Sequence, residues 1–280
     1  MKVAVTGAAG LFGHGLVAAF STRHEVFPLT RVEADITNAE AVRAALERIR
    51  PDLVVHSAAI PDIDRCEEDP ASALQVNYQG TCNVVEAVRG LGAGLIHIST
   101  DAVFDGTNVI PYVETDPPAP ITVYGRTKLQ AEQAVKTLER SWIFRVSVLF
   151  GPGKINFVEK GLRKLVAGEE YRVTSDQLGC ALHTVDAGLK IMEVAEAGKY
   201  GLYHLANRGI CTRYELARAA AELAGLDPVK VVGVPDAQMK RRAPRLKYAV
   251  MKMEALRHAG FAFPRPWQEA LAEYVRTVKL

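Results

Sequence analysis

The sequence predicts an α/β fold in which a doubly wound parallel sheet carries a smaller, discontinuous C-terminal lobe. Short β-rich runs alternate with helical patterns through the first half of the 280 residues. These runs are apolar on both faces, which is typical of parallel strands that helices cover on both sides. A glycine-rich stretch, TGAAGLFG, also stands between the first such run and the first helical pattern.

Strand and helix candidates alternate in the first half as they do in successive βαβ units. The strand candidates are KVAVTG, HEVFPL, DLVVHSA, GLIHIST and SWIFRVSVLF. The helix candidates are FGHGLVAAFS, NAEAVRAALERIR, PASALQVNYQGTCNVVEAVRGLG and VYGRTKLQAEQAVKTLER. This order of elements predicts a Rossmann-type sheet.

The alternation loosens after residue 150, where a second lobe is expected. VDAGLKIMEVAEAG and GLYHLAN are expected to return to the sheet as one more helix and strand. TRYELARAAAELAG and PWQEALAEYVRTV are expected to be helices of the lobe. We therefore assign residues 1–150 and about 181–210 to a cofactor-binding Rossmann domain, and about 151–180 and 211–280 to a substrate-binding lobe.

Composition and charge exclude several classes of partner. Hydrophobic residues make up 49% of the chain, charged residues 24%, and the formal net charge is +2, so no nucleic acid or membrane surface is expected as a partner. The cysteines lie far apart, which fits a reducing compartment; they are Cys66, Cys82, Cys180 and Cys211. No apolar run is long enough for a bilayer, and a strand beginning at Lys2 leaves no room for a signal sequence, so we expect a cytoplasmic protein.

The glycine-rich turn predicts a dinucleotide site. Gly7, Gly10 and Gly13 would allow a tight turn, close approach of the pyrophosphate, and packing of the helix start against the strand. The amides at the helix start, which include Leu11 and Phe12, would face the phosphates.

The end of the second strand is where the adenosine ribose is recognised in such folds. Thr30 and Arg31 stand there, and an arginine would pair with a 2′-phosphate, which favours NADP(H) over NAD(H). Glu33 keeps NAD(H) possible, because an acidic side chain would bind the ribose hydroxyls. Asp35, followed by Ile36, is expected either to hold the adenine edge or to cap the next helix.

Tyr124 and Lys128 form the candidate proton-transfer pair. They are four residues apart, so in a helix they share one face, and the lysine ammonium would lower the tyrosine pKa. Ser99 and Thr100 end the GLIHIST strand, and a hydroxyl at that edge would orient a substrate carbonyl beside the nicotinamide. The histidines show no metal-ligand spacing, so no catalytic metal is expected.

Six motifs in order resemble the extended short-chain dehydrogenase/reductase superfamily: TGAAGLFG, HSAA, ALQVNYQGT, STDAVFDG, YGRTK and FRVSVLFG. STDAVFDG, INFV and SDQLG are most similar to its dTDP-4-dehydrorhamnose reductase branch. The resemblance implies NADPH-dependent reduction of a nucleotide-linked 4-keto-6-deoxy sugar. It implies Tyr124 as proton donor, Lys128 at the nicotinamide ribose and Thr100 at the carbonyl. It places Ala58, Ala59 and Ser99 near the cofactor, and Asn77 there as well, ordering the active-site helix and its water.

The substrate side matches the family less closely. The resemblance gives Asp101, Val148, Asn156 and Arg242 as substrate-binding residues, but Val148 replaces a tryptophan that is usual in the family. The segment Cys180, Ala181 and Leu182 replaces a small-Pro-Thr run. Basic candidates for a substrate diphosphate are Lys154, Lys240, Arg241, Arg242, Arg245 and Lys247.

Two alternatives stay open. The fold could serve an epimerase or dehydratase that recycles its cofactor, although Ala102 stands where a dehydratase would carry glutamate. It could also serve a non-catalytic subunit that resembles the regulatory subunit of methionine adenosyltransferase. The sequence leaves both a monomer and a homodimer open.

Overall fold

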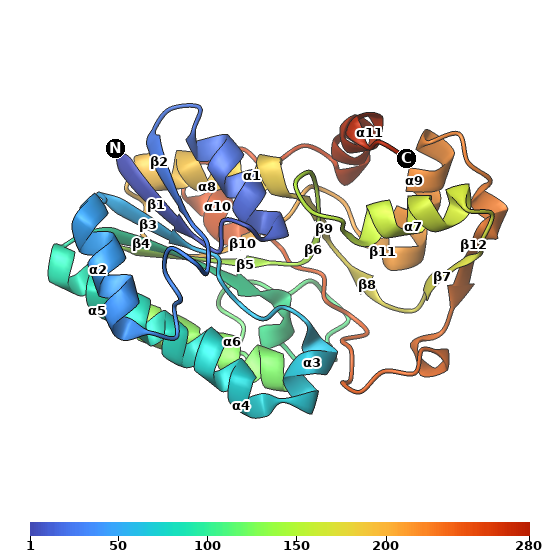
Figure 1. The fold of residues 1–280 in the computed structure, drawn as a ribbon. Helices are drawn as coiled ribbons and strands as arrows, with labels where there is room; N and C mark the ends of the chain where they lie inside the picture. The colour runs from blue at the N-terminus through green and yellow to red at the C-terminus, as the bar shows by residue number, and fades with distance from the viewer.

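A six-stranded sheet lies at the centre of the larger part of the molecule (Figure 1), and the computed structural model describes all residues 1–280. The strand order is β10-β5-β4-β3-β1-β2, and every neighbouring pair is parallel. The strands are β1 (Lys2–Thr6), β2 (Glu25–Leu29), β3 (Leu53–His56), β4 (Gly94–Thr100), β5 (Ser141–Val146) and β10 (Gly201–Leu205). The predicted α/β class with a doubly wound parallel sheet is confirmed.

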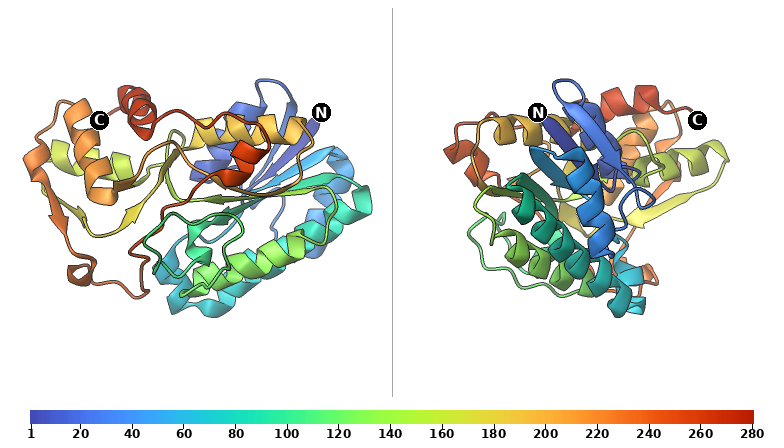
Figure 2. Two further views of the ribbon diagram at one scale, coloured as in Figure 1. Left: turned by 180° about the vertical axis from the view of Figure 1, so that it is seen from behind. Right: turned by 60° about the vertical axis from the view of Figure 1, so that its left-hand side comes forward.

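Helices cover both faces of this sheet, as the three views in Figures 1 and 2 show. Alternate residues of β1 face opposite cores: Val3 and Val5 belong to one apolar cluster and Ala4 to the other. One face carries α1 (Leu11–Phe20), α8 (Thr184–Glu196) and α10 (Glu254–His258), and the other carries α2 (Ala39–Ile49), α5 (Gly80–Leu91) and α6 (Val123–Val135). None of the helices is both long and apolar enough to span a bilayer.

A smaller lobe lies beside the sheet, at the right of Figure 1. It holds the helices α7 (Phe157–Val166), α9 (Arg213–Leu223) and α11 (Trp267–Thr277). Its two-stranded pairs are β6 (Val148–Phe150) with β9 (Ala181–His183), β7 (Tyr171–Thr174) with β12 (Val231–Val234), and β8 (Leu178–Gly179) with β11 (Cys211–Thr212). Two short helices, α3 (Ile63–Glu68) and α4 (Pro70–Ala73), follow β3.

The run SWIFRVSVLF, expected as one strand, is two. The chain leaves the central sheet after Val146, and Val148 begins β6, whose partner is β9. Ser147 lies at the break, where its hydroxyl donates a hydrogen bond to Asp101 at 2.5 Å. The run that the sequence pattern predicts as one strand therefore forms one strand of the sheet and one strand of the lobe.

The long helix expected over residues 70–92 is interrupted by a π-helical segment at Leu74–Gln79. The wider turn directs Asn77 toward Ile60, whose amide donates to Oδ1 of Asn77 at 2.7 Å and whose carbonyl accepts from Nδ2 at 3.2 Å. Nδ2 also donates to Thr127 of α6. Asn77 thus fixes the loop after β3 against α6.

The second half of the chain crosses between sheet and lobe more often than the sequence indicates. Met253 and Leu256 pack into the same apolar cluster as β1 and α8, and α10 lies against β10. These residues fall within 211–280, which we had placed in the lobe. α11 then returns to the lobe, where Trp267 and Leu271 pack with α7 and α9.

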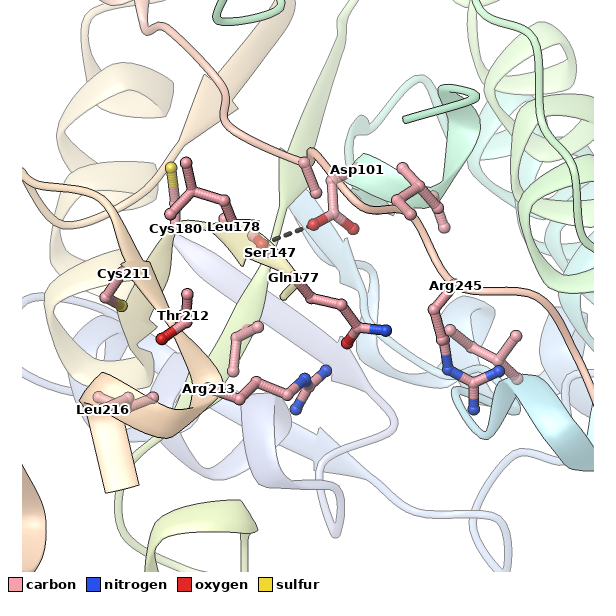
Figure 3. Close-up of a pocket in the computed structure, with 16 residues that line it drawn as sticks. Asp101, Ser147, Gln177, Leu178, Cys180, Cys211, Thr212, Arg213, Leu216 and Arg245 are labelled. Carbon is pink, nitrogen blue, oxygen red and sulfur yellow. Dashed lines mark hydrogen bonds between the residues drawn. The ribbon is translucent and has the colours of Figure 1, made fainter. Parts of the chain in front are cut away.

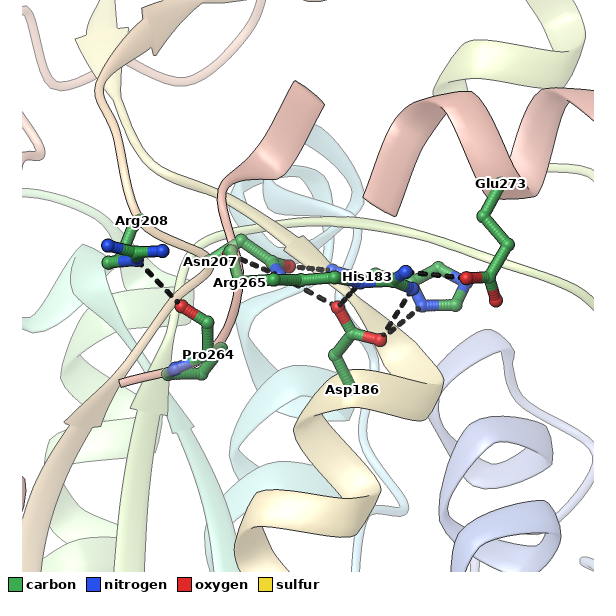
Figure 4. A network of polar contacts seen from close by, with 7 residues as sticks. All are labelled: His183, Asp186, Asn207, Arg208, Pro264, Arg265 and Glu273. Carbon is green, nitrogen blue, oxygen red and sulfur yellow. Dashed lines mark hydrogen bonds and ion pairs between the residues drawn. The ribbon is translucent and has the colours of Figure 1, made fainter. Parts of the chain in front are cut away.

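A polar network joins α8 to α11 (Figure 4). The Asp186 carboxylate accepts hydrogen bonds from Nδ2 of Asn207 at 2.8 Å and from Nε of Arg265 at 2.8 Å, and it contacts Nδ1 of His183 at 3.1 Å. Arg265 also pairs with Glu273 of α11. Burial raises the pKa of Asp186, but the hydrogen bonds from His183 and Arg265 outweigh it and leave the pKa well below its usual value. The network therefore ties α11 of the lobe to α8, which packs on the sheet.

Candidate active site

Two adjoining cavities run along the carboxyl ends of the parallel strands. The first has a volume of about 520 Å³ and is lined by the turn after β1 and by the tips of β2 and β3. The second, of about 490 Å³, is lined by the start of α1, the ends of β4 and β5, and α6. They share Gly10, Ser57, Ala59 and Lys154. Ligands of doubly wound folds bind at this edge, where the strand order reverses between β1 and β3.

The glycine turn is packed so closely against neighbouring backbone that side chains would collide there. Gly7 has a φ of +72°, and a Cβ there would lie 2.6 Å from the amide nitrogen of Ala58. A Cβ on Gly13 would lie 2.1 Å from the carbonyl oxygen of Gly7. Gly10 precedes α1 without a side chain to cap it, so the first amides of the helix are free for a ligand. This geometry fits the pyrophosphate of a dinucleotide.

The first cavity brings together most of the residues predicted for the adenosine end: Gly7, Gly10, Thr30, Arg31, Asp35, Ile36, Ala58 and Ala59. Sequence reasoning missed Arg65, Ser72 and Gln75, which come from α3 and the segment after it. No motif marks these three residues.

Both acidic residues near the ribose position are engaged within the chain. Oε2 of Glu33 accepts hydrogen bonds from the amide, at 2.8 Å, and the hydroxyl of Thr30. Oδ1 of Asp35 accepts from Thr37, and Oδ2 accepts from Nε of Arg31 at 2.9 Å. These contacts hold the pKa of each carboxyl below its usual value. Asp35 does not cap the next helix, because Asn38 does, accepting from Ala41.

The candidate catalytic residues line the second cavity together. Thr100 ends β4, and Tyr124 and Lys128 lie one turn apart on α6. Thr122 caps the start of this helix, and its hydroxyl accepts from the amide of Gly125 at 3.0 Å. A Cβ on Gly125 would lie 2.1 Å from the carbonyl oxygen of Ala102. Glycine at this position therefore lets α6 start directly against the turn that follows Thr100.

The protonation of the pair differs from our expectation. Burial raises the pKa of Tyr124 far above its usual value, and the nearby Thr100 hydroxyl opposes this only partly. Burial also lowers the pKa of Lys128 to about 7. The Lys128 ammonium instead contacts Nε2 of His97, and the groups that influence the tyrosine pKa are Thr100, Asp101 and Cys66 rather than Lys128. Tyr124 therefore remains protonated over the physiological range.

Ser99 lines the same cavity, but its hydroxyl donates to Oε1 of Glu132 at 2.5 Å. Glu132 pairs with Arg145 through Nε at 2.9 Å and Nη2 at 2.8 Å, and both side chains are buried. Neither Glu132 nor Arg145 was singled out from the sequence, since an acid in a helix and a base in a strand are usually exposed.

A third cavity, of about 90 Å³, opens between the sheet and the lobe (Figure 3). It adjoins the second cavity, because both are lined by Asp101, Ser147 and Val148. Burial raises the pKa of Asp101, while the hydroxyls of Ser147 and Thr100 donate to its carboxylate and oppose that shift. Gln177 and Arg213 face the same space in Figure 3. Leu178, Gly179, Cys180 and Cys211 add an apolar wall.

Basic side chains converge on this third cavity. Arg213, the first residue of α9, and Arg245 both line it. The guanidinium of Arg213 makes no hydrogen bond within the chain and lies 5.3 Å from the ring centre of Phe157. Burial, and next the charge of Arg241, lower the pKa of Arg213. Arg213 is thus a cation without an ion-pair partner where the second and third cavities adjoin, while Arg245 is paired with Asp64.

Three predicted site residues lie outside all three cavities. Asn77 is wholly buried and bonded to Ile60 and Thr127. Asn156 caps α7, and its amide donates to Gly151 and to the Tyr274 hydroxyl at 2.6 Å.

Arg242 is the third of these residues, and its side chain is 76% exposed and pairs with Glu68. Arg245, rather than Arg242, lines the third cavity, and its guanidinium pairs with Asp64. Lys154, considered for a substrate diphosphate, instead lines the first and second cavities.

The geometry agrees with comparisons to known proteins. The family described as the RmlD substrate-binding domain matches residues 1–280. The spore coat polysaccharide biosynthesis protein SpsK of Bacillus subtilis is 36% identical over 277 residues, covering 98% of this chain and 97% of that protein. A dTDP-4-keto-6-deoxy-D-glucose reductase of Streptomyces niveus is 38% identical over 272 residues, covering 96% and 94%.

Among solved structures, that of dTDP-4-dehydrorhamnose reductase from Bacillus anthracis in complex with NADP superposes with a TM-score of 0.95. It is 33% identical and covers 99% of each chain. The resemblance drawn from the sequence motifs is confirmed. The chain belongs to the RmlD substrate-binding domain family.

Proposed function

We propose that this protein reduces the keto group of a nucleotide-linked 4-keto-6-deoxy sugar with NADPH. The observation that carries the proposal is that Thr100, Tyr124 and Lys128 line one cavity, which adjoins the glycine-turn cavity on one side and the arginine-lined cavity on the other. This order fits a dinucleotide, a reacting carbonyl and a nucleotide diphosphate laid end to end. The dTDP-sugar reductases among the relatives support the substrate class.

The sheet domain holds the cofactor in this proposal. The amides at the start of α1 and the Lys154 ammonium, which lines both cofactor cavities, bind the pyrophosphate. Arg31 binds the 2′-phosphate, because its Nε is tethered to Asp35 while its two terminal nitrogens stay free. With Glu33 and Asp35 both engaged, neither carboxylate is positioned to select unphosphorylated NADH. NADPH is therefore the preferred cofactor.

Bound NADPH supplies the hydride that reduces the carbonyl carbon. Tyr124 donates its phenolic proton to the carbonyl oxygen, so that C=O becomes CH–OH. Its raised pKa keeps that proton in place until the oxygen gains negative charge. The Thr100 hydroxyl is held at the end of β4, where it accepts from the amide of Ala102 at 3.1 Å. It orients the carbonyl when its proton, donated to Asp101 in the free protein, turns to the carbonyl oxygen.

The lobe recognises the nucleotide part of the substrate. Arg213 lines the third cavity with its guanidinium free of hydrogen bonds within the chain, whereas Arg245, which also lines it, pairs with Asp64. A free guanidinium can pair with phosphate through two parallel hydrogen bonds, so Arg213 is the main phosphate ligand in this proposal. Mutual repulsion among cations that lie close together is relieved when a diphosphate binds between them. Gln177 supplies an amide for a base or sugar hydroxyl.

Two other functions have less support. A dehydratase needs a further acid beside the tyrosine, but Ala102 carries none and Asp101 is occupied by Ser147 and Thr100. A non-catalytic subunit has no need of Thr100, Tyr124 and Lys128 in one cavity.

The proposal is tested by titrating the purified protein with NADPH and NADH and then adding dTDP-4-keto-6-deoxy-glucose or its epimer. We expect tighter binding of NADPH, followed by loss of NADPH absorbance in step with formation of the 4-hydroxy sugar. Binding of NADPH without oxidation by any 4-keto-6-deoxy sugar nucleotide would contradict the proposed reaction and leave only the cofactor site.

A further inference from the structure

A buried histidine contacts the side chain of the candidate lysine. Nζ of Lys128 is 3.1 Å from Nε2 of His97, and the two side chains come from residues that are 3% and 0% exposed. His97 lies on β4, three residues before Thr100, and its side chain contacts Lys128 of α6. The ammonium has no other hydrogen-bond partner in the chain.

The direction of this hydrogen bond follows from the chemistry of the two groups. An ammonium has three N–H donors and no acceptor, so Nε2 of His97 must accept with its lone pair. The imidazole proton is then on Nδ1, which has no partner. His97 is thereby neutral, and two of the three Lys128 donors remain for the cavity that the lysine lines.

No other group near Lys128 accepts a hydrogen bond from its ammonium. Glu132, four residues further along α6, is already paired with Arg145 and Ser99. His56 of β3 lies against His97, with ring centres 5.4 Å apart.

Both ring nitrogens of His56 are engaged. The hydroxyl of Thr81 donates to a carbonyl, so it accepts from Nε2 of His56, and Nδ1 then accepts from the hydroxyl of Thr6 at 2.7 Å. Tyr124, one turn before Lys128, keeps its proton. His97 is thus the direct acceptor for the ammonium.

We propose that His97 is a positioning residue of the active site: its neutral imidazole accepts one hydrogen bond from Lys128 and turns the other two ammonium donors toward the cofactor cavity. The ribose next to the nicotinamide presents two neighbouring hydroxyls, which match two remaining donors. This inference rests on the proposed function for the identity of the cofactor, but the hydrogen bond itself is a property of the free protein.

The protonation of both groups supports this role. Burial, and then the charge of Lys128, hold the pKa of His97 well below its ordinary value, so the ring stays neutral while the lysine is charged. Burial also brings the pKa of Lys128 to about 7, which makes the ammonium sensitive to loss of its acceptor. A hydrogen bond to the charged form favours that form, so removing the acceptor lowers the lysine pKa further.

The experiment compares His97→Gln, which keeps an acceptor near the position of Nε2, with His97→Leu, which removes it. The matched control is His56→Gln, which alters the neighbouring buried histidine but not the contact to Lys128. Imidazole ¹⁵N spectra of the wild-type protein, with the His97 signal assigned through the variants, report the tautomer without cofactor. NADPH titrations from pH 6 to 9, and unfolding curves for each variant, complete the set.

We expect His97 to carry its proton on Nδ1. His97→Leu should weaken NADPH binding about tenfold, the effect of one hydrogen bond to a charged group, and move the alkaline loss of binding to lower pH. His97→Gln and His56→Gln should remain within about threefold of wild type, since both keep the acceptor for Lys128. A proton on Nε2 of His97 would overturn the inference. So would a His97→Leu variant whose loss of NADPH binding is fully explained by its smaller folded fraction and whose binding keeps the wild-type pH dependence. Failure of the proposed reaction would appear separately, as NADPH binding without oxidation by the keto sugar.

Discussion

Nε of Arg31 lies 2.9 Å from Oδ2 of Asp35, so the acidic side chain that could bind ribose hydroxyls instead orients an arginine. The Arg31 side chain is 86% exposed, and its remaining donors are accessible at the mouth of the first cavity. An unpaired Asp35 carboxylate would repel a 2′-phosphate. Because Arg31 pairs with it, the remaining arginine donors attract the phosphate instead.

Arg31→Ala should therefore weaken NADPH binding by about 10- to 100-fold, the loss of a charge-assisted pair, and leave NADH binding nearly unchanged. The measurement is the ratio of the two dissociation constants. Arg43→Ala is the control, because Arg43 pairs with Glu40 on α2 and lines none of the three cavities. Equal weakening of NADPH and NADH by Arg31→Ala would show that Arg31 does not read the 2′-phosphate.

Gly13→Ala should abolish dinucleotide binding. A Cβ at Gly13 would lie 2.1 Å from the Gly7 carbonyl oxygen, so the turn must open. Gly90→Ala serves as the control, since Gly90 lies in the last turn of α5 and a Cβ there meets nothing within 4 Å. Calorimetric titration with NADPH distinguishes them: unchanged affinity in Gly13→Ala would mean that the turn does not cradle the phosphates.

Arg213→Ala should raise KM for the keto sugar nucleotide by about 10- to 100-fold while kcat changes much less, because the guanidinium binds the part of the substrate that does not react. Arg242→Ala should have no effect, because Arg242 is exposed and pairs with Glu68. Steady-state kinetics at saturating NADPH separates the two variants. An increase in KM for Arg242→Ala and none for Arg213→Ala would reverse our assignment of the diphosphate site.

Stability should fall as the pH drops from 7 to 5, because three buried histidines, His56, His97 and His204, resist protonation. Burial lowers the pKa of His56 and of His204 to about 3. The unfolded chain takes up protons near pH 6.5 and the folded chain does not, so each histidine costs about 2 kcal/mol of unfolding free energy over this interval. Urea unfolding at the two pH values measures the change. His204→Gln should reduce the pH dependence by about that amount, and an unchanged dependence in this variant would contradict the account.

Local patterns predict the cofactor half of the molecule well. The glycine spacing, the strand ends and the four-residue separation of Tyr124 and Lys128 depend on short stretches of chain, so the sequence alone places them. Their geometric convergence then follows from the parallel sheet, because successive strands end at the same edge.

The substrate half depends on contacts between distant segments. Arg245 lines the third cavity and Arg242 does not, yet both lie in an irregular segment where no period fixes which side chain points inward. Asn156 matches a family motif but is used as a helix cap. His97 resembles any other polar residue in a strand until α6 brings Lys128 against it.

The measurement that tests the central claim most directly is NADPH oxidation by a dTDP-4-keto-6-deoxy sugar in Tyr124→Phe against wild type. Tyr203→Phe is the control, since the Tyr203 hydroxyl donates to the carbonyl of Lys199 and lies outside the three cavities. We predict that Tyr124→Phe binds NADPH normally but loses at least about 100-fold in kcat, the usual contribution of a general acid, while Tyr203→Phe retains activity. Wild-type turnover in Tyr124→Phe would contradict the claim that this tyrosine delivers the proton.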